Sequence, residues 1–190
     1  MKKEEFGFIF AFHNLNYWPM KKLFFAFAFA LFAISSHAQD TSKSSKNDIP
    51  PLILKDMNGK EVDLQALAKQ GRPIILSFWA TWCSPCKKEL ENINLVIDDW
   101  RKQYNVNLVA ISIDDSRNSM KVKTFIDGKK WDYTVLLDVN QDLQRALGVP
   151  NVPYSILIDK NGHIVYRHIG YTEGDESVLE AKLAEIAKSK

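Results

Sequence analysis

Residues 78–86 of the chain are Phe78-Trp79-Ala80-Thr81-Trp82-Cys83-Ser84-Pro85-Cys86, and they contain both of its two cysteines. Two cysteines at this spacing can close a very small disulfide. The apolar run Ile74–Trp79 predicts a buried strand just before the pair, and Pro85 suits the first turn of a helix because it has no N–H to lose. At such a strand-to-helix junction the helix dipole and the free amide groups favour a thiolate, so Cys83 is the predicted nucleophile.

A helix is predicted directly after the cysteine pair. Apolar side chains recur mostly at helical spacing from Ser84 to Tyr104, at positions Leu90, Ile93, Leu95, Ile97 and Trp100. The helix therefore buries one face against a core. We expect Cys83 to be exposed at the junction and Cys86, one turn into the helix, to be more buried.

Other roles for the cysteine pair fit the sequence less well. A structural zinc site needs four ligands, and the chain has no second CxxC or CxxH pair. Covalent haem attachment requires a histidine directly after the second cysteine, where Lys87 stands. A purely structural disulfide would restrict the unfolded chain little, because the loop is so short. Redox exchange is therefore favoured, and a copper or other metal carrier that uses both thiolates is the non-enzymatic alternative.

The histidines do not extend the cysteine pair into an evident metal site. His163 and His168 are the two that would belong to a mature domain, and they lie five residues apart on one expected strand. Successive side chains of a strand alternate between its faces, so these two point to opposite sides. We assign no metal ligands.

The N-terminal region has the pattern of a secretory signal peptide. Met20-Lys21-Lys22 is followed by the apolar run Leu23–Ile34 and then by Ser36-His37-Ala38, which has small residues where a cleavage site requires them. Residues 1–38 are thus interpreted as an N-terminal extension and signal peptide, with Met20 as the true start. We expect export to the periplasm or cell envelope, with membrane anchoring as the alternative if the signal is not cleaved.

A polar linker and one globular domain follow the signal. Residues 39–48 are rich in Ser, Lys, Asp and Asn, and residues 49–190 form the expected domain. Residues 1–38 hold four of the 25 basic and two of the 23 acidic residues, so the remainder carries no net charge. No basic patch indicates a nucleic-acid partner. In an oxidising compartment an exposed cysteine pair becomes oxidised, so a reducing role needs an electron donor.

The domain is predicted to be an α/β structure. An N-terminal β-hairpin turns at Gly59, and a second hairpin turns at Asn161-Gly162, the strongest short hairpin signal. Between them strands alternate with helices, which predicts a central mixed β-sheet with helices on both faces. The expected strands are 52–54, 62–64, 74–79, 106–113, 135–137, 154–158 and 163–169, and the expected later helices are 118–128, 141–147 and 175–188. The polar turn at 114–116 is expected to cap the first of these helices.

The stretch from Phe78 to Leu90 resembles the thioredoxin superfamily, and most closely the exported TlpA/ResA-like thiol-disulfide oxidoreductases. The resemblance covers about residues 50–188 and implies a thioredoxin-like fold with an extra helix-containing insertion at 116–135. Gly148–Tyr154 resembles the cis-proline loop of the family, which implies a cis Val152–Pro153 peptide bond packed beside the cysteines. Only X-Pro peptides adopt the cis form at low cost.

The resemblance also bears on proton transfer. Thioredoxins of the cytoplasmic type carry a buried aspartate where this chain has Ser77. The TlpA/ResA-like branch instead has a glutamate three residues after the second cysteine, and Glu89 matches it. Glu89 either relays protons to the buried thiol or is an ordinary solvated carboxylate on a helix, and both interpretations stay open at this point.

These observations predict a dithiol/disulfide cycle. The Cys83 thiolate attacks a partner disulfide, and Cys86 then resolves the mixed disulfide. Trp82 is expected to shield the sulfur and the Val152 backbone to pair with the partner chain, whereas Trp79 is expected in the core.

The predicted function is reduction of protein disulfides in the envelope, for example in apocytochrome c. We expect electrons to come from a membrane-embedded donor, the protein to be a monomer, and no cofactor to be needed beyond the Cys83–Cys86 disulfide. A thiol peroxidase of the same fold is the alternative enzyme. Peroxiredoxins have a threonine three residues before the reactive cysteine, and here that position is Ala80.

Overall fold

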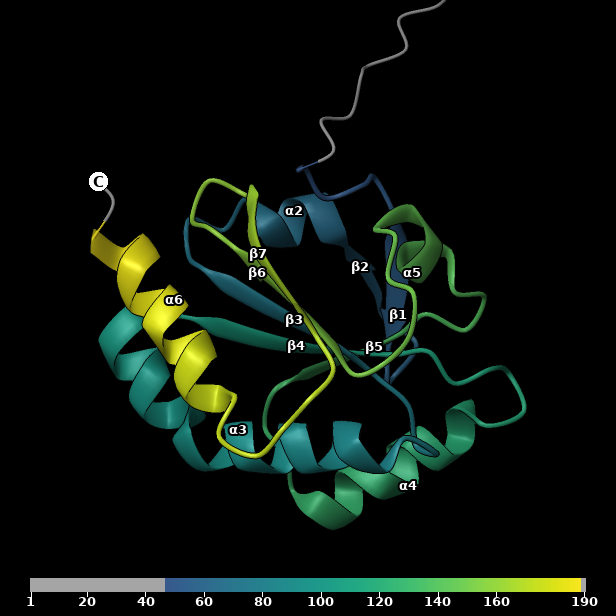
Figure 1. Cartoon of the computed structure of the whole chain (residues 1–190). Coiled ribbons are helices and arrows are strands. Elements are labelled where there is room, and N and C mark those ends of the chain that lie inside the picture. Colours follow the sequence, from purple (N-terminus) through teal and green to yellow (C-terminus); the bar gives the residue numbers. More distant parts are fainter. Residues whose placement is uncertain (1–46, 189–190) are drawn as a thin grey trace, which may run out of the picture. The chain divides into compact units, whose positions relative to one another are not determined.

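The computed structural model describes residues 47–188, which build one seven-stranded sheet in the order β2-β1-β5-β4-β3-β6-β7 (Figure 1). The strands β3, β4 and β5 run parallel, and all other neighbours are antiparallel. The predicted mixed sheet is therefore confirmed. The strands are β1 Ile53–Asp56, β2 Glu61–Asp63, β3 Ile74–Trp79, β4 Asn107–Ser112, β5 Thr134–Leu137, β6 Tyr154–Ile158 and β7 Ile164–Ile169.

Helices cover both faces of this sheet. Figure 1 shows α3, α4 and α6 on one side and α2 and α5 on the other. This is the three-layer arrangement that strands alternating with helices predict. The helices are α2 Leu64–Ala68, α3 Ser84–Tyr104, α4 Ser119–Lys129, α5 Asp142–Ala146 and α6 Glu176–Lys188. The bounds of α3 are the predicted ones, and α4 belongs to the expected insertion.

The central strand β3 lies in the middle of the core, and all six of its residues are buried. Helices on both sides exclude water from it, so a continuous apolar sequence is favoured there over an alternating one. Trp79 is fully buried, which confirms its predicted place in the core. Its ring lies 5.6 Å from that of Phe125 and 5.8 Å from that of Trp131, measured between centroids. The insertion is thus packed onto the end of β3 that leads to the cysteines.

Two apolar helix residues lie outside the core, and for Leu95 this is contrary to the predicted packing. Leu95 on α3 is 80 % exposed, because it lies off the stripe formed by Leu90, Ile93, Ile97 and Trp100. Val178 on α6 is 40 % exposed, whereas its neighbour Leu179 is buried.

The described part of the chain begins two residues before the expected domain start. The backbone oxygen of Asn47 accepts a hydrogen bond from the Ile164 amide at 2.7 Å, and Asp48 forms a β-bridge with His163. These pairings attach the end of the expected linker to the second hairpin. The predicted signal peptide, the start at Met20 and the linker up to residue 46 lie outside the described residues. No helix within residues 47–188 combines the length and the apolar character that a membrane span requires.

Candidate active site

The two cysteines form a disulfide at the start of α3, with their Cα atoms 5.4 Å apart. Cys83 is the N-cap residue of the helix, and its sulfur accepts a hydrogen bond from the Cys86 amide at 3.3 Å. Pro85 lies in the first turn, where the loss of its N–H costs nothing. The predicted strand-to-helix junction is confirmed, and the sulfur of Cys83 occupies the anion-favouring end of the helix.

Cys83 is more buried than predicted. It is 5 % exposed and Cys86 is fully buried, so the expected exposure of Cys83 is wrong and only the order of the two is confirmed. The chain turns back before the helix, since the Cys83 amide donates to the Ala80 carbonyl at 3.0 Å. The neighbouring residue Trp82 is 64 % exposed, so solvent meets the indole side chain rather than Cys83.

The proline loop lies at the same end of the sheet as the cysteines. The Val152–Pro153 peptide bond is cis, as predicted. Tyr154, the first residue of β6, pairs with Phe78 at the end of β3 that runs into the cysteine loop. The Pro153 carbonyl accepts a hydrogen bond from the Gly170 amide at 2.9 Å, which fastens the loop to the end of β7.

Glu89 is a buried carboxyl group one turn after Cys86, so the solvated alternative is wrong. It is 1 % exposed and lies between two serines of the sheet. The Ser155 hydroxyl donates to its Oε1 at 2.8 Å, and the Ser77 hydroxyl donates to its Oε2 at 3.5 Å. Ser77 and Ser155 are directly paired across β3 and β6, so one position of the sheet supplies both donors.

Burial raises the pKa of Glu89 from 4.5 to about 7. The serine hydrogen bonds act in the opposite direction, and the negative charges of Glu176 and Asp175 at the start of α6 add a smaller upward contribution. Residues three apart on a helix lie on the same face, so Glu89 and Cys86 are neighbours. The site therefore combines a dithiol/disulfide pair with a carboxyl group that gains and loses a proton near neutral pH.

Comparisons with known proteins agree with this geometry. A family model described as the AhpC/TSA family matches residues 46–167. The chain belongs to the AhpC/TSA family. The thiol-disulfide oxidoreductase ResA of Bacillus thuringiensis (strain Al Hakam) is 32 % identical over 139 residues, which cover 73 % of this chain and 76 % of the relative. ResA of Bacillus subtilis (strain 168) is also 32 % identical, over 124 residues that cover 65 % and 66 % of the two chains.

Solved structures place this AhpC/TSA protein among thioredoxin-like folds. A thioredoxin-like protein from Porphyromonas gingivalis has 45 % sequence identity and a TM-score of 0.67, with 74 % of this chain and 92 % of that chain covered. StoA from Bacillus subtilis has 27 % identity and a TM-score of 0.57, with coverage of 70 % and 98 %. Together with the ResA relatives, these likenesses identify this AhpC/TSA protein as a thioredoxin-like thiol-disulfide oxidoreductase.

A second buried carboxylate, Asp114, was not predicted to belong to the site of this AhpC/TSA protein. It is 1 % exposed, and it accepts hydrogen bonds from the Thr81 amide at 2.9 Å and the Thr81 hydroxyl at 2.6 Å. The Ser112 hydroxyl donates to it at 2.9 Å. The expected capping of α4 by the turn 114–116 is wrong, because Asn118 is the N-cap residue and makes no side-chain capping bond; Asp115 accepts from the Asn118 amide at 3.1 Å just before the helix. Asp114 thus fixes the loop two residues before Cys83.

Ser155 was also missed, although the sequence carries a signal for it. A serine in the middle of the apolar strand β6 must find a hydrogen-bond partner when it is buried, because an unpaired hydroxyl costs free energy there. Ser77 in β3 carries the same signal. Two such serines on neighbouring strands indicate a shared polar partner, which is Glu89.

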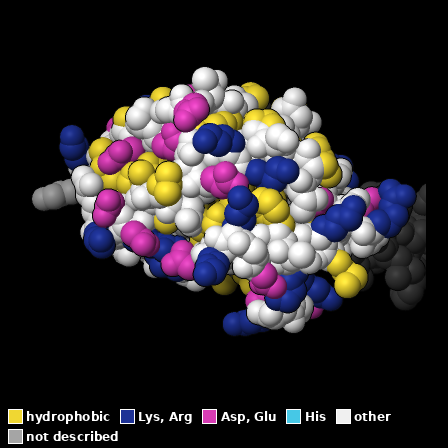
Figure 2. Space-filling view, turned by 90° about the horizontal axis from the view of Figure 1, so that it is seen from below, with side chains coloured by type: hydrophobic (Ala, Val, Ile, Leu, Met, Phe, Trp, Pro, Cys, Tyr) yellow, Lys and Arg dark blue, Asp and Glu magenta, His cyan; other side chains and the backbone are white. Residues whose placement is uncertain are grey.

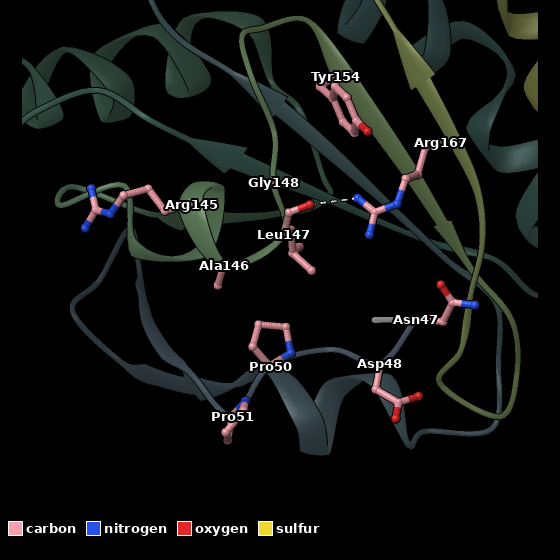
Figure 3. A pocket seen from close by; sticks show the side chains of 10 residues that line it. All are labelled: Asn47, Asp48, Pro50, Pro51, Arg145, Ala146, Leu147, Gly148, Tyr154 and Arg167. Carbon is pink, nitrogen blue, oxygen red and sulfur yellow. Dashed lines mark hydrogen bonds between the residues drawn. The ribbon is translucent and has the colours of Figure 1, made fainter. Parts of the chain in front are cut away.

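A pocket lies apart from the cysteines. It has a volume of about 750 Å³, and its walls come from Asn47, Asp48, Pro50 and Pro51, from the end of α5 and from strands β6 and β7 (Figure 3). Tyr154 lines it, whereas its neighbour Ser155 points to Glu89, so the pocket and Glu89 lie on opposite faces of the sheet. Arg167 closes one side through a 2.9 Å hydrogen bond to the Leu147 carbonyl.

The two histidines of the domain occupy separate places. His168 lies 3.1 Å from Asp175, and His163 lies 3.9 Å from Asp48. Among the residues that the structure describes, no group of three or more His, Cys, Asp or Glu side chains is arranged to hold a metal ion.

Proposed function

We propose that this oxidoreductase works as an exported reductase that transfers electrons from a membrane-embedded donor to disulfides of cell-envelope proteins, with apocytochrome c as a candidate substrate. The observation that carries the proposal is the buried Glu89, whose pKa is about 7, one helical turn after Cys86. A resolving cysteine that is fully buried needs a nearby group to remove its proton, and Glu89 is suited to that task at neutral pH.

The proposed cycle starts from the reduced pair. The Cys83 thiolate attacks one sulfur of the substrate disulfide, which forms a mixed disulfide and releases the first substrate thiolate. Glu89 accepts the proton of the Cys86 thiol. The Cys86 thiolate then attacks the Cys83 sulfur, releases the second substrate thiolate and leaves the enzyme disulfide seen here. Two electrons pass to the substrate, and the donor restores the dithiol through the same steps in reverse.

The surroundings of the disulfide support a polypeptide partner. Trp82 is 64 % exposed beside the sulfur, and Val152 precedes the cis-proline on a loop at the same end of the sheet. A loop backbone in this position can pair with an extended segment, so affinity comes from main-chain hydrogen bonds. The protein acts as a monomer in this scheme, because one chain supplies both cysteines and the proton acceptor.

Thiol peroxidase activity is less well supported by the geometry. Ala80 offers no hydroxyl at the threonine position of peroxiredoxins. The hydroxyl of the next residue, Thr81, is already held by Asp114.

The reduction potential of the Cys83/Cys86 pair, equilibrated against glutathione and dithiothreitol, tests the proposal. A value near or below about −250 mV is expected for a reductase, and a value near about −120 mV would identify an oxidant and reject it. Exchange activity should disappear in Cys83→Ser, whereas reduced Cys86→Ser should attack a labelled disulfide substrate, release one labelled thiolate and stay trapped as the mixed disulfide with the other half. Rapid peroxide consumption by the wild type would favour the peroxidase instead.

A further inference from the structure

A groove opens beside the cysteine loop, on the side formed by the insertion helix α4. It has a volume of about 430 Å³ and is lined by Thr81 from the loop and by Met120, Lys121, Thr124 and Phe125 from α4. It is separate from the pocket of Figure 3, and we refer to it as the α4 groove. The proton chemistry described above uses none of these side chains.

Large apolar side chains are exposed at the α4 groove. Met120 is 83 % exposed at its edge, and Phe125 is half-buried with its ring packed on Trp79 and Trp131. Trp82, next to Thr81 in the chain, adds a second exposed apolar side chain at 64 %. Exposed large apolar side chains that gather around a hollow indicate a surface for binding another molecule.

The position of the groove next to the cysteine loop indicates which molecule it binds. Thr81 lies two residues before Cys83 and is fixed by its two hydrogen bonds to Asp114, so the groove wall is rigidly connected to the reacting sulfur. A polypeptide whose disulfide reaches Cys83 must place its neighbouring residues on this surface. The groove is therefore continuous with the surface that the substrate has to contact.

Basic side chains border the groove. The Lys121 ammonium group is held by the neutral amide of Asn118 at 2.8 Å. The Lys87 and Lys129 ammonium groups each lie 5.7 Å from the centre of the Phe125 ring, and Lys129 is also paired with the Glu91 carboxylate at 2.7 Å. On the face that carries α3 and α4, Figure 2 shows Lys and Arg side chains next to hydrophobic islands, intermixed with acidic ones. Such a rim favours an acidic residue beside an apolar one in the bound segment.

We propose that the α4 groove is a specificity site for the substrate polypeptide: it receives an apolar side chain close to the reacting cysteine, with an acidic neighbour beside Lys87 and Lys121. The inference rests on the proposed reaction with protein disulfides and adds what such a substrate must carry. It also gives the insertion a role, because α4 supplies four of the five residues that line the groove.

The test compares Met120→Glu with Leu95→Glu in the full-length reduced protein. Leu95 and Met120 both lie on helices and are about equally exposed, at 80 % and 83 %, but Leu95 lies outside the groove. A glutamate in the first turn of α4 also suits the helix dipole, so the fold should tolerate it. Met120→Leu serves as the conservative variant and should behave as the wild type.

Each variant is assayed with three oxidants: oxidised glutathione and two synthetic peptides with one disulfide each. One peptide carries Glu-Leu next to a cysteine and the other carries Ser-Ser there. We expect Met120→Glu to lower kcat/KM for the Glu-Leu peptide about tenfold, as the loss of one buried apolar contact predicts, and to leave glutathione disulfide unchanged. The wild type and Leu95→Glu should prefer the Glu-Leu peptide by a similar factor.

Two results would overturn the proposal: equal reduction of both peptides by the wild type, or the same loss in Met120→Glu for glutathione disulfide as for the Glu-Leu peptide. Failure of the proposed function looks different, because the wild type would then reduce none of the three oxidants.

Discussion

Glu89 and Asp114 are two carboxyl groups that flank the cysteine loop, equally buried at 1 % exposure, and the donors around them differ. Asp114 receives a backbone amide and two hydroxyl groups, all within 2.9 Å. Glu89 receives two serine hydroxyls, one of them at 3.5 Å. Asp114, which has more and closer hydrogen-bond donors, holds the loop in place. Glu89, which has fewer, has a pKa of about 7 and is available for proton transfer.

The difference follows from where each residue lies in the fold. Asp114 lies two residues after the end of β4, and the Thr81 amide, two residues after the end of β3, donates its hydrogen bond to the Asp114 carboxylate. Glu89 lies inside α3, where the backbone amides are used by the helix itself, so only side chains remain as donors. Burial alone therefore does not decide what a carboxyl group does, because the hydrogen-bond donors decide whether its charge is compensated.

The largest expected effect is a pH-dependent loss of stability caused by Glu89. Its pKa is about 7 in the folded chain and 4.5 in the unfolded one, so between these values the folded state binds more protons. The free energy of unfolding should then fall as the pH rises from 4.5 to about 7, by about 3 kcal/mol at 1.4 kcal/mol per pKa unit. Chemical unfolding of the oxidised protein at a series of pH values measures this.

The control for that prediction is Glu89→Gln, which keeps the shape of the side chain and cannot ionise. The difference in stability between wild type and variant should grow across the same pH interval and be constant below it. A parallel pH dependence in the two proteins would show that Glu89 does not titrate as described. The comparison with Asp114 would then lose its basis.

A smaller but clear loss is expected for Asp114→Asn. Both carboxylate oxygens accept hydrogen bonds, Oδ1 from the Thr81 hydroxyl and Oδ2 from the Thr81 amide and the Ser112 hydroxyl, so the new amide N–H₂ group must replace one of these acceptors and meet its donors. The free energy of unfolding should drop by about 2 kcal/mol, and the pH slope that belongs to Glu89 should stay. Thermal and urea unfolding measure the loss, with Asp99→Asn on the exposed side of α3 as the control that changes little. A loss no larger than that of the control would refute the anchoring role of Asp114.

The sequence predicts most of the fold because the spacing of apolar residues along the chain indicates which segments form buried strands and which form helices that cover the sheet. The continuous apolar run in β3, the Asn-Gly turn before β7 and the helix after the cysteines all match the structure. The cis Val152–Pro153 bond was predictable from the resemblance of its loop to a known motif. These features depend on short stretches of chain, which is why one sequence is enough to predict them.

The parts that were missed depend on contacts between distant stretches. The burial of Cys83 and the hydrogen bond from the Thr81 amide to Asp114 require that two loops lie next to each other. The pattern of residues within either loop does not specify this. The state of Glu89 stayed open for the same reason, because its donors come from β3 and β6. The sequence feature that could have indicated the buried state of Glu89 is the presence of Ser77 and Ser155 inside apolar strands.

The smallest expected effect separates the two serines that contact Glu89. Ser155→Ala removes the 2.8 Å hydrogen bond and should raise the pKa of Glu89 by about one unit above 7, because a charge-assisted bond of about 1.5 kcal/mol to the ionised form is lost. Ser77→Ala removes a contact at 3.5 Å and should raise it by less. Carbon-13 NMR titration of the Glu89 carboxyl in the oxidised protein measures both shifts. Because Ser77 and Ser155 are paired in the sheet and equally buried, a larger shift in Ser77→Ala would mean that hydrogen-bond length does not set the proton affinity of Glu89. The contrast with the closely held Asp114 would then need another cause.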